Sequence, residues 1–305
     1  MEPIVGSGKY TYRVREDWQQ PPEWLDVKAC AVTVDSQDRV YCFNRNDAHP
    51  VVIFDRDGKF LNSWGAGLFR FPHAIRIVKE NGNDIVWICD EHHNQFFKFT
   101  TDGKLLQTIG KQGERSDTGI TDGDLSSTAW KKVTHGGGPF NLPTDIAFAP
   151  NGDIFITDGY GNARVHKFSP DAKYMYSWGE PGTAPGQFNL PHGAWIDRRG
   201  RLLIADREND RVQVFDQDGK LLTVWPTELI GPAFFYVDDE DTVYIPEHNA
   251  GMISILTLDG ERLARWGGPE HRSCHGIWVD SHHDLYVVQP GDWGRVRRVV
   301  KYERQ

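Results

Sequence analysis

The chain has 305 residues, of which 39% are hydrophobic and 25% are charged, so it is long enough to bury a sizeable core. No stretch approaches the roughly 20 apolar residues of a membrane-spanning helix, which excludes a helical membrane protein and a membrane partner. The 43 acidic and 34 basic residues give a formal charge of -9, which argues against nucleic acid as a partner. The first residues lack the basic and apolar regions of a secretory signal, so we expect a cytoplasmic protein.

Glycine, proline and tryptophan are abundant, with 31, 17 and 11 residues, whereas there are only 4 cysteines. Frequent turn formers and aromatic residues favour many short strands. The cysteines occur singly, with no Cys-x-x-Cys pair, so the sequence indicates neither a zinc knuckle nor a disulfide framework. We expect buried free thiols at Cys30, Cys42, Cys89 and Cys274.

Residues 9–14 alternate between polar and apolar side chains, as a half-buried strand does. After them, a unit of about four strands recurs every ~40–45 residues where no insertion intervenes. The clearest copy is 190–225, in which apolar runs are separated by turns that contain Gly, Asn and Asp. In chain order, the copies cover residues 31–65, 71–110, 142–179, 190–225, 231–267 and 274–302.

The last copy has a third strand from Val296 to Tyr302 but no fourth strand. The N-terminal strand at 9–14 can supply it, so that the first and last segments pair. Six units closed in this way predict an all-β fold, a single six-bladed β-propeller domain over residues 1–305. Closure also leaves no long exposed edge strand. An open β-solenoid or a sandwich is the alternative.

The period is interrupted by a long insertion between the second and third units, at residues 111–139. It ends in three consecutive glycines, Gly136 to Gly138. Loops of this length are usually either functional or disordered. We expect this one to be a lid over one face of the propeller.

The residue that opens the first strand of each blade has a fixed position beside the central channel. This position holds His73, His192 and His275 in blades two, four and six, but Thr144 and Ala233 in blades three and five. Alternate blades of a six-bladed ring are about 120° apart, so the three imidazoles enter the channel at one depth. A single histidine here is often only a turn residue, but three in register favour a metal site. Three histidines with an open fourth position are typical of catalytic zinc, and imidazole also suits other divalent transition metals.

The turn between the second and third strands of each blade faces the same side as the histidines. Its Asp and Asn residues brace the turn, whereas Arg45, Tyr160 and Arg207 occupy variable positions. An arginine pair near a metal is suited to hold a carboxylate. A tyrosine whose pKa is lowered by a metal and a guanidinium can act as a general base. The alternative for each of these three residues is a side chain that packs at the rim for structural reasons alone. The same rim carries four residues to which we assign no role: Glu91, His92, His93 and His248.

Residues 140–216 closely resemble the peptidyl-α-hydroxyglycine α-amidating lyases, a family of NHL-repeat propellers, and the resemblance continues more weakly over most of the chain. It is carried by Leu-Pro-Thr-Asp-Ile-Ala from Leu142, Asp-Gly-Tyr-Gly-Asn from Asp158 and Ala-Asp-Arg-Glu-Asn from Ala205. The resemblance implies three zinc ligands, one catalytic base and two substrate-positioning arginines. These are His73, His192 and His275, then Tyr160, and then Arg45 and Arg207.

In that family, zinc and the tyrosine act on the hydroxyl of a carbinolamide, and the C–N bond breaks to give a primary amide and glyoxylate. The resemblance therefore implies a zinc-dependent carbon–nitrogen lyase whose substrate is a small molecule with a carboxylate. Two features depart from the family. Gly276 replaces an Asp that contributes to a structural Ca²⁺ site, so we do not expect this ion. The places of the family's disulfides are taken by Leu142, Gly161, Leu203 and Val214, which agrees with a reducing compartment.

Two other functions stay open. A zinc-dependent hydrolase of an ester, lactone or amide is one, because a zinc-bound water can hydrolyse as readily as eliminate. The three-histidine pattern argues against a close match to lactonase-type propellers, which typically bind calcium through carboxylate and Asn ligands. The other is a non-catalytic NHL propeller that serves as a binding scaffold, which predicts no stoichiometric metal.

Overall fold

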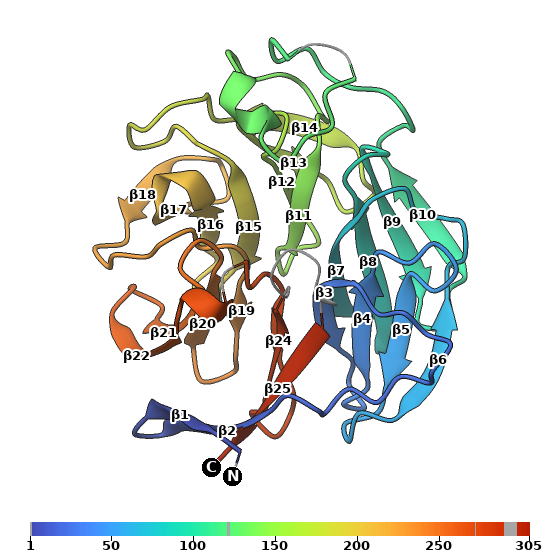
Figure 1. The fold of residues 1–305 in the computed structure, drawn as a ribbon. Helices are drawn as coiled ribbons and strands as arrows, with labels where there is room; N and C mark the ends of the chain where they lie inside the picture. The colour runs from blue at the N-terminus through green and yellow to red at the C-terminus, as the bar shows by residue number, and fades with distance from the viewer. Residues whose placement is uncertain (1, 121–122, 272, 290–297) are drawn as a thin grey trace.

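The computed structural model describes residues 2–120, 123–271, 273–289 and 298–305. Six antiparallel sheets are arranged as blades around a central channel, which confirms the predicted six-bladed β-propeller (Figure 1). The first strands of neighbouring blades contact each other, β3 with β7, β7 with β11 and β11 with β15, so these strands line the channel.

Blades one to three are four-stranded, and the insertion between the second and third contains one short 3-10 helix. Their elements are β3 Ala29–Val34, β4 Val40–Asn44, β5 Val51–Phe54 and β6 Phe60–Trp64; β7 Pro72–Glu80, β8 Asn83–Asp90, β9 Gln95–Thr100 and β10 Leu105–Ile109; η1 Ala129–Lys132; and β11 Pro143–Phe148, β12 Ile154–Asp158, β13 Arg164–Phe168 and β14 Tyr174–Trp178.

Blades four and five are also four-stranded, and blade six is completed by the N-terminus. Their elements are β15 Pro191–Ile196, β16 Leu202–Asp206, η2 Arg207–Asn209, β17 Arg211–Phe215 and β18 Leu221–Val224; β19 Tyr236–Val237, β20 Thr242–Glu247, β21 Met252–Thr257 and β22 Arg262–Gly267; η3 Pro269–His271; and β23 Ile277–Val279, β24 Leu285–Gln289 and β25 Arg298–Arg304.

The ring closes through the N-terminal strands β1 Ile4–Ser7 and β2 Tyr10–Arg15. β2 pairs antiparallel with β25, with Tyr12 opposite Arg304 and Val14 opposite Tyr302, as the sequence predicted. The predicted third strand of blade six began at Val296, which lies outside the described residues. The sequence missed β1, which pairs with β2 and makes this sheet five-stranded. β1 is only four residues long and includes Gly6 at a φ of 84°, so its local signal is weak.

The excess of tryptophan and glycine has a packing explanation. A tryptophan that ends or follows a fourth strand lies against a turn glycine of the next blade: Trp64 on Gly103, and Trp178 on Gly219. A Cβ at these glycines would lie 2.7 and 2.8 Å from the indole, and both glycines have φ near +85°. Only glycine accepts both the close approach and the positive φ. Packing of a tryptophan on a glycine therefore joins each of these blades to the next.

The four cysteines are buried and free, as expected from their spacing. The helices in the described ranges are 3-10 turns of 3 or 4 residues, and none is long and apolar enough to cross a membrane. Gly276, where the resembling family has Asp, packs closely against blade one: a Cβ here would lie 2.9 Å from the Cα of Ala31. A larger residue at 276 would require blades one and six to separate.

Candidate metal centre

Where a first strand reaches the channel, its pairing is irregular. The register of β3, β7, β11 and β15 shifts at its second residue, and the pairing passes over Cys30, His73, Thr144 and His192. A bulge of this kind re-aims a side chain away from the regular alternation of the sheet. Blades five and six place Ala233 and His275 at the same position, where their amides donate to the carbonyls of Pro246 and Val288. We call these positions the inner ring: Cys30, His73, Thr144, His192, Ala233 and His275.

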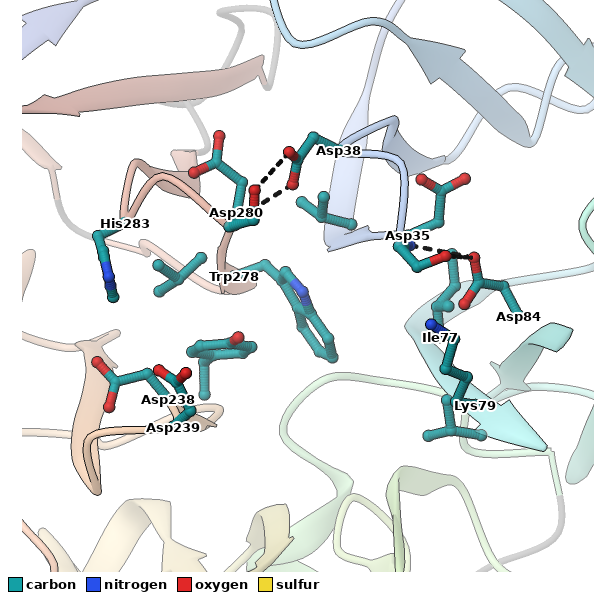
Figure 2. A pocket seen from close by; sticks show the side chains of 16 residues that line it. Asp35, Asp38, Ile77, Lys79, Asp84, Asp238, Asp239, Trp278, Asp280 and His283 are labelled. Atoms are coloured by element: carbon teal, nitrogen blue, oxygen red, sulfur yellow. Dashed lines mark hydrogen bonds between the residues drawn. The ribbon is translucent and has the colours of Figure 1, made fainter. Parts of the chain in front are cut away.

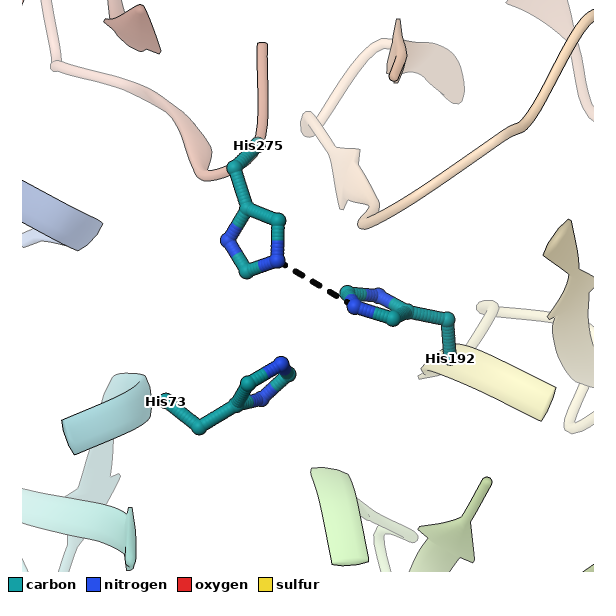
Figure 3. A group of neighbouring side chains, drawn as sticks. All are labelled: His73, His192 and His275. Carbon is teal, nitrogen blue, oxygen red and sulfur yellow. Dashed lines mark hydrogen bonds between the residues drawn. The ribbon is translucent and has the colours of Figure 1, made fainter. Parts of the chain in front are cut away.

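The three histidines of the inner ring converge on one point (Figure 3). One ring nitrogen of each lies within 4.8 Å of the others, and the ring centroids are 4.8 to 5.1 Å apart. The side chains are buried, with 0%, 0% and 8% exposure for His73, His192 and His275. The structure therefore brings the predicted ligands together with nearly threefold symmetry.

Each histidine is oriented by a backbone carbonyl of the intervening blade. Nδ1 of His73 lies 2.7 Å from the Thr144 carbonyl oxygen, and Nδ1 of His192 lies 3.0 Å from that of Ala233. The third contact, Nδ1 of His275 to the Cys30 carbonyl oxygen, is 2.7 Å long. A carbonyl oxygen can only accept, so Nδ1 carries the proton in all three rings. The three Nε2 atoms then present lone pairs.

The protonation state of the rings fits a metal. Burial, together with the positive charge of Arg45, lowers the pKa of His73 to about 3. Burial also places the pKa values of His192 and His275 well below their usual range, with Arg207 adding to the shift of His192 and His73 to that of His275. All three rings are therefore neutral at pH 7, as metal-ligating imidazoles must be.

Few hydrogen-bond donors lie near the Nε2 lone pairs. Nε2 of His73 has no hydrogen-bond partner among the described residues, and those of His192 and His275 face each other 3.2 Å apart. Zinc–nitrogen bonds of roughly 2.0–2.1 Å at tetrahedral angles place neighbouring nitrogens about 3.4 Å apart. The donor set and its neutrality thus fit Zn²⁺ or a similar divalent metal, and so does the spacing of the His192–His275 pair; the three donors together lie within 4.8 Å of one another.

A second set of side chains surrounds this centre, from the turns between second and third strands. In five blades, the first turn residue that faces the channel donates its backbone N–H to the carbonyl two residues before the inner-ring residue, at 2.7 to 3.2 Å. We call this set the turn ring; its blade-six counterpart falls outside the described residues. Its members, which all line one cavity of 370 Å³, are Arg45, Glu91, Tyr160, Arg207 and His248.

The turn ring is held by the acidic or amide residue that ends each second strand. Asp90 accepts from the backbone N–H groups of Arg70 and Phe71 at 2.6 and 3.1 Å. Asp158 accepts from the Asn141 amide at 2.9 Å and from Asn162 Nδ2 at 2.9 Å. This confirms that the Asp and Asn of these turns are braces.

Tyr160 connects the two rings. Its hydroxyl accepts a hydrogen bond from Arg207 Nη1 at 2.9 Å and lies 3.4 Å from His192 Nε2. Burial raises the pKa of Tyr160, and Arg207 only partly offsets the rise. The expected lowering also needs the charge of a bound cation, and it stays a prediction. Arg45 reaches the same cavity, with its guanidinium 3.8 Å from the centre of the Phe71 ring.

The sequence analysis gave roles to three members of the turn ring and placed the other two, Glu91 and His248, on the same rim without a role. Both directly follow the residue that ends a second strand, Asp90 and Glu247. This fixed position, directly after the last residue of a second strand, could have identified both residues from the sequence. Burial raises the pKa of Glu91, against the opposing effects of His92 and Arg45.

The insertion covers this side of the channel. Leu125 and Ser127 line the 370 Å³ cavity, and Leu125 packs against the cluster that contains Tyr160. The Thr118 hydroxyl donates to the carbonyl of Gly161 at 2.7 Å, which ties the insertion to the Tyr160 turn. The predicted lid is thus placed over the candidate site, with residues 121 and 122 outside the described part.

The other end of the channel has a cavity of 430 Å³ with acidic side chains around Trp278 (Figure 2). We call it the far mouth. Its carboxylates brace the hairpins that follow the first strands: Asp280 accepts from the backbone of His282 and Asp284 at 2.9 Å and from the Tyr286 hydroxyl at 3.0 Å. Asp35 and Asp238 make the same contacts six residues before Tyr41 and Tyr244. The sequence reasoning missed this Asp-x₅-Tyr repeat.

Comparison with known proteins agrees with this architecture. The family model "NHL repeat" matches residues 140–168 and 188–215. Among solved structures, a gluconolactonase from Xanthomonas campestris superposes with a TM-score of 0.66 at 14% identity, covering 100% of this chain and 96% of that one. A streptogramin B lyase structure gives a TM-score of 0.59 at 14% identity, covering 96% and 88%. At such identities these two show the shared fold alone.

Sequence relatives are more similar. Human NHL repeat-containing protein 3 is 34% identical over 260 residues, which cover 81% of this chain and 70% of the relative. Peptidyl-alpha-hydroxyglycine alpha-amidating lyase 1 of Drosophila melanogaster is 32% identical over 248 residues, covering 77% of this chain and 40% of the relative. The chain therefore belongs to the family of NHL-repeat β-propeller proteins and, within it, resembles the peptidyl-α-hydroxyglycine α-amidating lyases.

Proposed function

We propose that this protein is a metal-dependent lyase that cleaves the C–N bond of a small carbinolamide of the N-acyl-α-hydroxyglycine type. The observation that carries the proposal is the convergence of three neutral imidazoles, with their Nε2 lone pairs directed inward, next to Tyr160 and Arg207. The 32% identity to an amidating lyase supports the choice of reaction.

The two arginines are placed to bind the substrate carboxylate. Both line the cavity, and a planar guanidinium matches a carboxylate in two parallel hydrogen bonds. Arg207 is 5% exposed and also donates to Tyr160, so it can bring the carboxylate and the base to the same place. Holding the reacting groups in one geometry is itself a large part of catalysis.

Tyr160 is the proton acceptor in this proposal. It takes the proton of the substrate hydroxyl, and the O–H electrons form the carbonyl of glyoxylate. The C–N electrons leave on the amide nitrogen, which takes up the proton from Tyr160 to give the primary amide and restore the base. A divalent metal held by His73, His192 and His275 would supply the positive charge that acidifies the hydroxyl and Tyr160. Arg207 stabilises the phenolate form through its hydrogen bond to the Tyr160 oxygen.

The test is to incubate zinc-loaded protein with N-acetyl-α-hydroxyglycine and to assay glyoxylate. We expect turnover by the wild type and a loss of about 10²–10⁴-fold in Tyr160→Phe, which keeps the ring and removes the proton acceptor. Mass spectrometry of the acyl product separates elimination, which gives acetamide, from hydrolysis, which gives acetate. No glyoxylate from a protein with stoichiometric metal would refute the proposal. A purified protein that binds no metal would favour the scaffold instead.

A further inference from the structure

Glu91 occupies a functional position that the proposed chemistry leaves unused. Its backbone N–H donates to the Phe71 carbonyl at 3.2 Å, the same anchor that places Arg45 and Arg207 in the turn ring. Its side chain is 2% exposed and lines the cavity above the histidines. Of the described residues that line this cavity, Glu91 alone carries a carboxylate.

The carboxylate of Glu91 is poorly satisfied by its surroundings. It lies 3.5 Å from His92 Nε2 and 3.9 Å from His73 Nε2, and both distances exceed the range of a normal hydrogen bond. Glu247, the buried glutamate of blade five, instead accepts from Ile230 N, Ser254 Oγ and Arg265 Nε at 2.6 to 2.8 Å. A buried carboxylate without good donors is costly, so its retained acceptor capacity points to a ligand.

The cavity therefore has two kinds of recognition group. Arg45 and Arg207 can bind an anion, Arg207 in addition to its ion pair with Glu208, and the Glu91 carboxylate can accept from a hydrogen-bond donor. In an N-acyl-α-hydroxyglycine the carboxylate, the hydroxyl and the N–H all branch from one carbon atom or its neighbouring nitrogen. These three groups match the arginines, the histidine–tyrosine centre and Glu91, which lies next to His73.

We infer that Glu91 is a specificity-determining residue that accepts a hydrogen bond from the amide N–H of the substrate whose carboxylate the arginines hold. The substrate class is thereby narrowed to secondary amides, since an N-alkylated amide or an ester would leave Glu91 unpaired. A site built to bind an N–H discriminates strongly against analogues that lack it. The inference rests on the proposed function for the identity of the substrate.

The test measures binding rather than turnover. N-acetylglycine has the carboxylate and the N–H, whereas N-acetylsarcosine has the carboxylate and an N-methyl group. Isothermal titration of zinc-loaded wild type is expected to show at least about tenfold tighter binding of N-acetylglycine, the size of one hydrogen bond to a charged group. In Glu91→Ala this ratio should fall close to one. In Glu91→Gln, whose amide oxygen still accepts, it should stay intermediate.

The matched control is Glu240→Ala, which removes a carboxylate from an exposed pair with Lys9 and should leave the ratio unchanged. An unchanged ratio in Glu91→Ala, or no binding of N-acetylglycine to the wild type, would overturn the inference. So would a loss of zinc in Glu91→Ala, because Glu91 would then be a metal ligand. If Glu91→Ala does not fold, Glu91→Gln decides by the same ratio. A clear N–H preference without glyoxylate formation would uphold this inference while the proposed reaction fails.

Discussion

The two ends of the channel hold cavities of similar size, 430 and 370 Å³, yet they differ in the charge of their lining groups and in how those groups are used. At the far mouth, Asp35, Asp238 and Asp280 are each saturated by backbone N–H groups and a tyrosine hydroxyl. At the histidine end, Nε2 of His73 has no partner among the described residues, and the Glu91 carboxylate has only distant ones. Unused hydrogen-bonding capacity thus distinguishes the candidate site from the structural carboxylates of the far mouth.

The two ends also differ in how far their residues vary from blade to blade. The far-mouth position carries the same Asp and Tyr in blades one, five and six, where the two residues brace the same turn. The turn-ring position carries a different chemical group in almost every blade, and the same backbone hydrogen bond holds it each time. A repeat that keeps its backbone and varies one side chain presents several kinds of group to a single cavity.

The largest effect should come from a change at the histidine end. His192→Ala removes one of three converging Nε2 donors, so the purified protein should lose its stoichiometric metal and glyoxylate formation should fall by about 100-fold or more. Metal analysis and the glyoxylate assay check this. Full metal content in the variant would contradict the comparison, because the side chains at the histidine end would then have a structural role like those of the far mouth.

A change near the far mouth should instead act on stability. Arg76 is 5% exposed; its Nε donates to Asp145 at 2.9 Å and its guanidinium lies 4.9 Å from the Trp195 ring centre. Arg76→Ala removes the cation that pairs with the buried Asp145 and leaves it only the Ala194 N–H as a donor, so the variant should lower the free energy of unfolding by about 3–5 kcal/mol. Denaturant unfolding measures the loss. The metal content per folded molecule should not change, and a coupled loss of metal would show that the two ends are not independent.

The stability of the metal-free protein should fall in mild acid. Because the folded-state pKa values of His73, His192 and His275 lie below their unfolded value of 6.5, the unfolded chain binds more protons as the pH falls through 6.5. Each histidine should then cost about 1 kcal/mol of stability between pH 6.5 and 5.5, about 3 kcal/mol in total. Urea unfolding of the protein after removal of metal by a chelator tests this. In His192→Ala, about a third of the pH dependence of the free energy of unfolding should disappear. A pH-independent wild type would contradict it.

The smallest effect should come from the exposed carboxylate of the far mouth. Asp239 lines the 430 Å³ cavity and is exposed to solvent. Asp239→Asn should change the free energy of unfolding by less than about 0.5 kcal/mol and should leave metal content and turnover unchanged. Thermal unfolding and the glyoxylate assay test both. A loss of activity in this variant would mean that the far mouth takes part in function.

Much of this fold could be predicted because its signals are local. Alternating apolar residues and turn formers define each blade, and Trp178 and Gly219 recur at matching places in the period. The same period placed His73, His192 and His275 at one depth. The strand β1 was missed because Ile4–Ser7 is short. The effect of burial on the pKa of Tyr160 could not be predicted, because this burial depends on Leu125 of the insertion and on Leu190 of the next blade.

The sequence by itself determined the number of blades, the closure by a strand at residues 9–14 and the register of the histidines, since side-chain period and turn chemistry act between near neighbours. Only the tertiary structure decided what the histidines present to the channel. Nδ1 of His275 is held by the Cys30 carbonyl, 245 residues away, and this contact exists only once the ring has closed. The inward lone pairs of the histidines, and the distance of the Glu91 carboxylate from its nearest partners, follow from atoms that distant blades bring together.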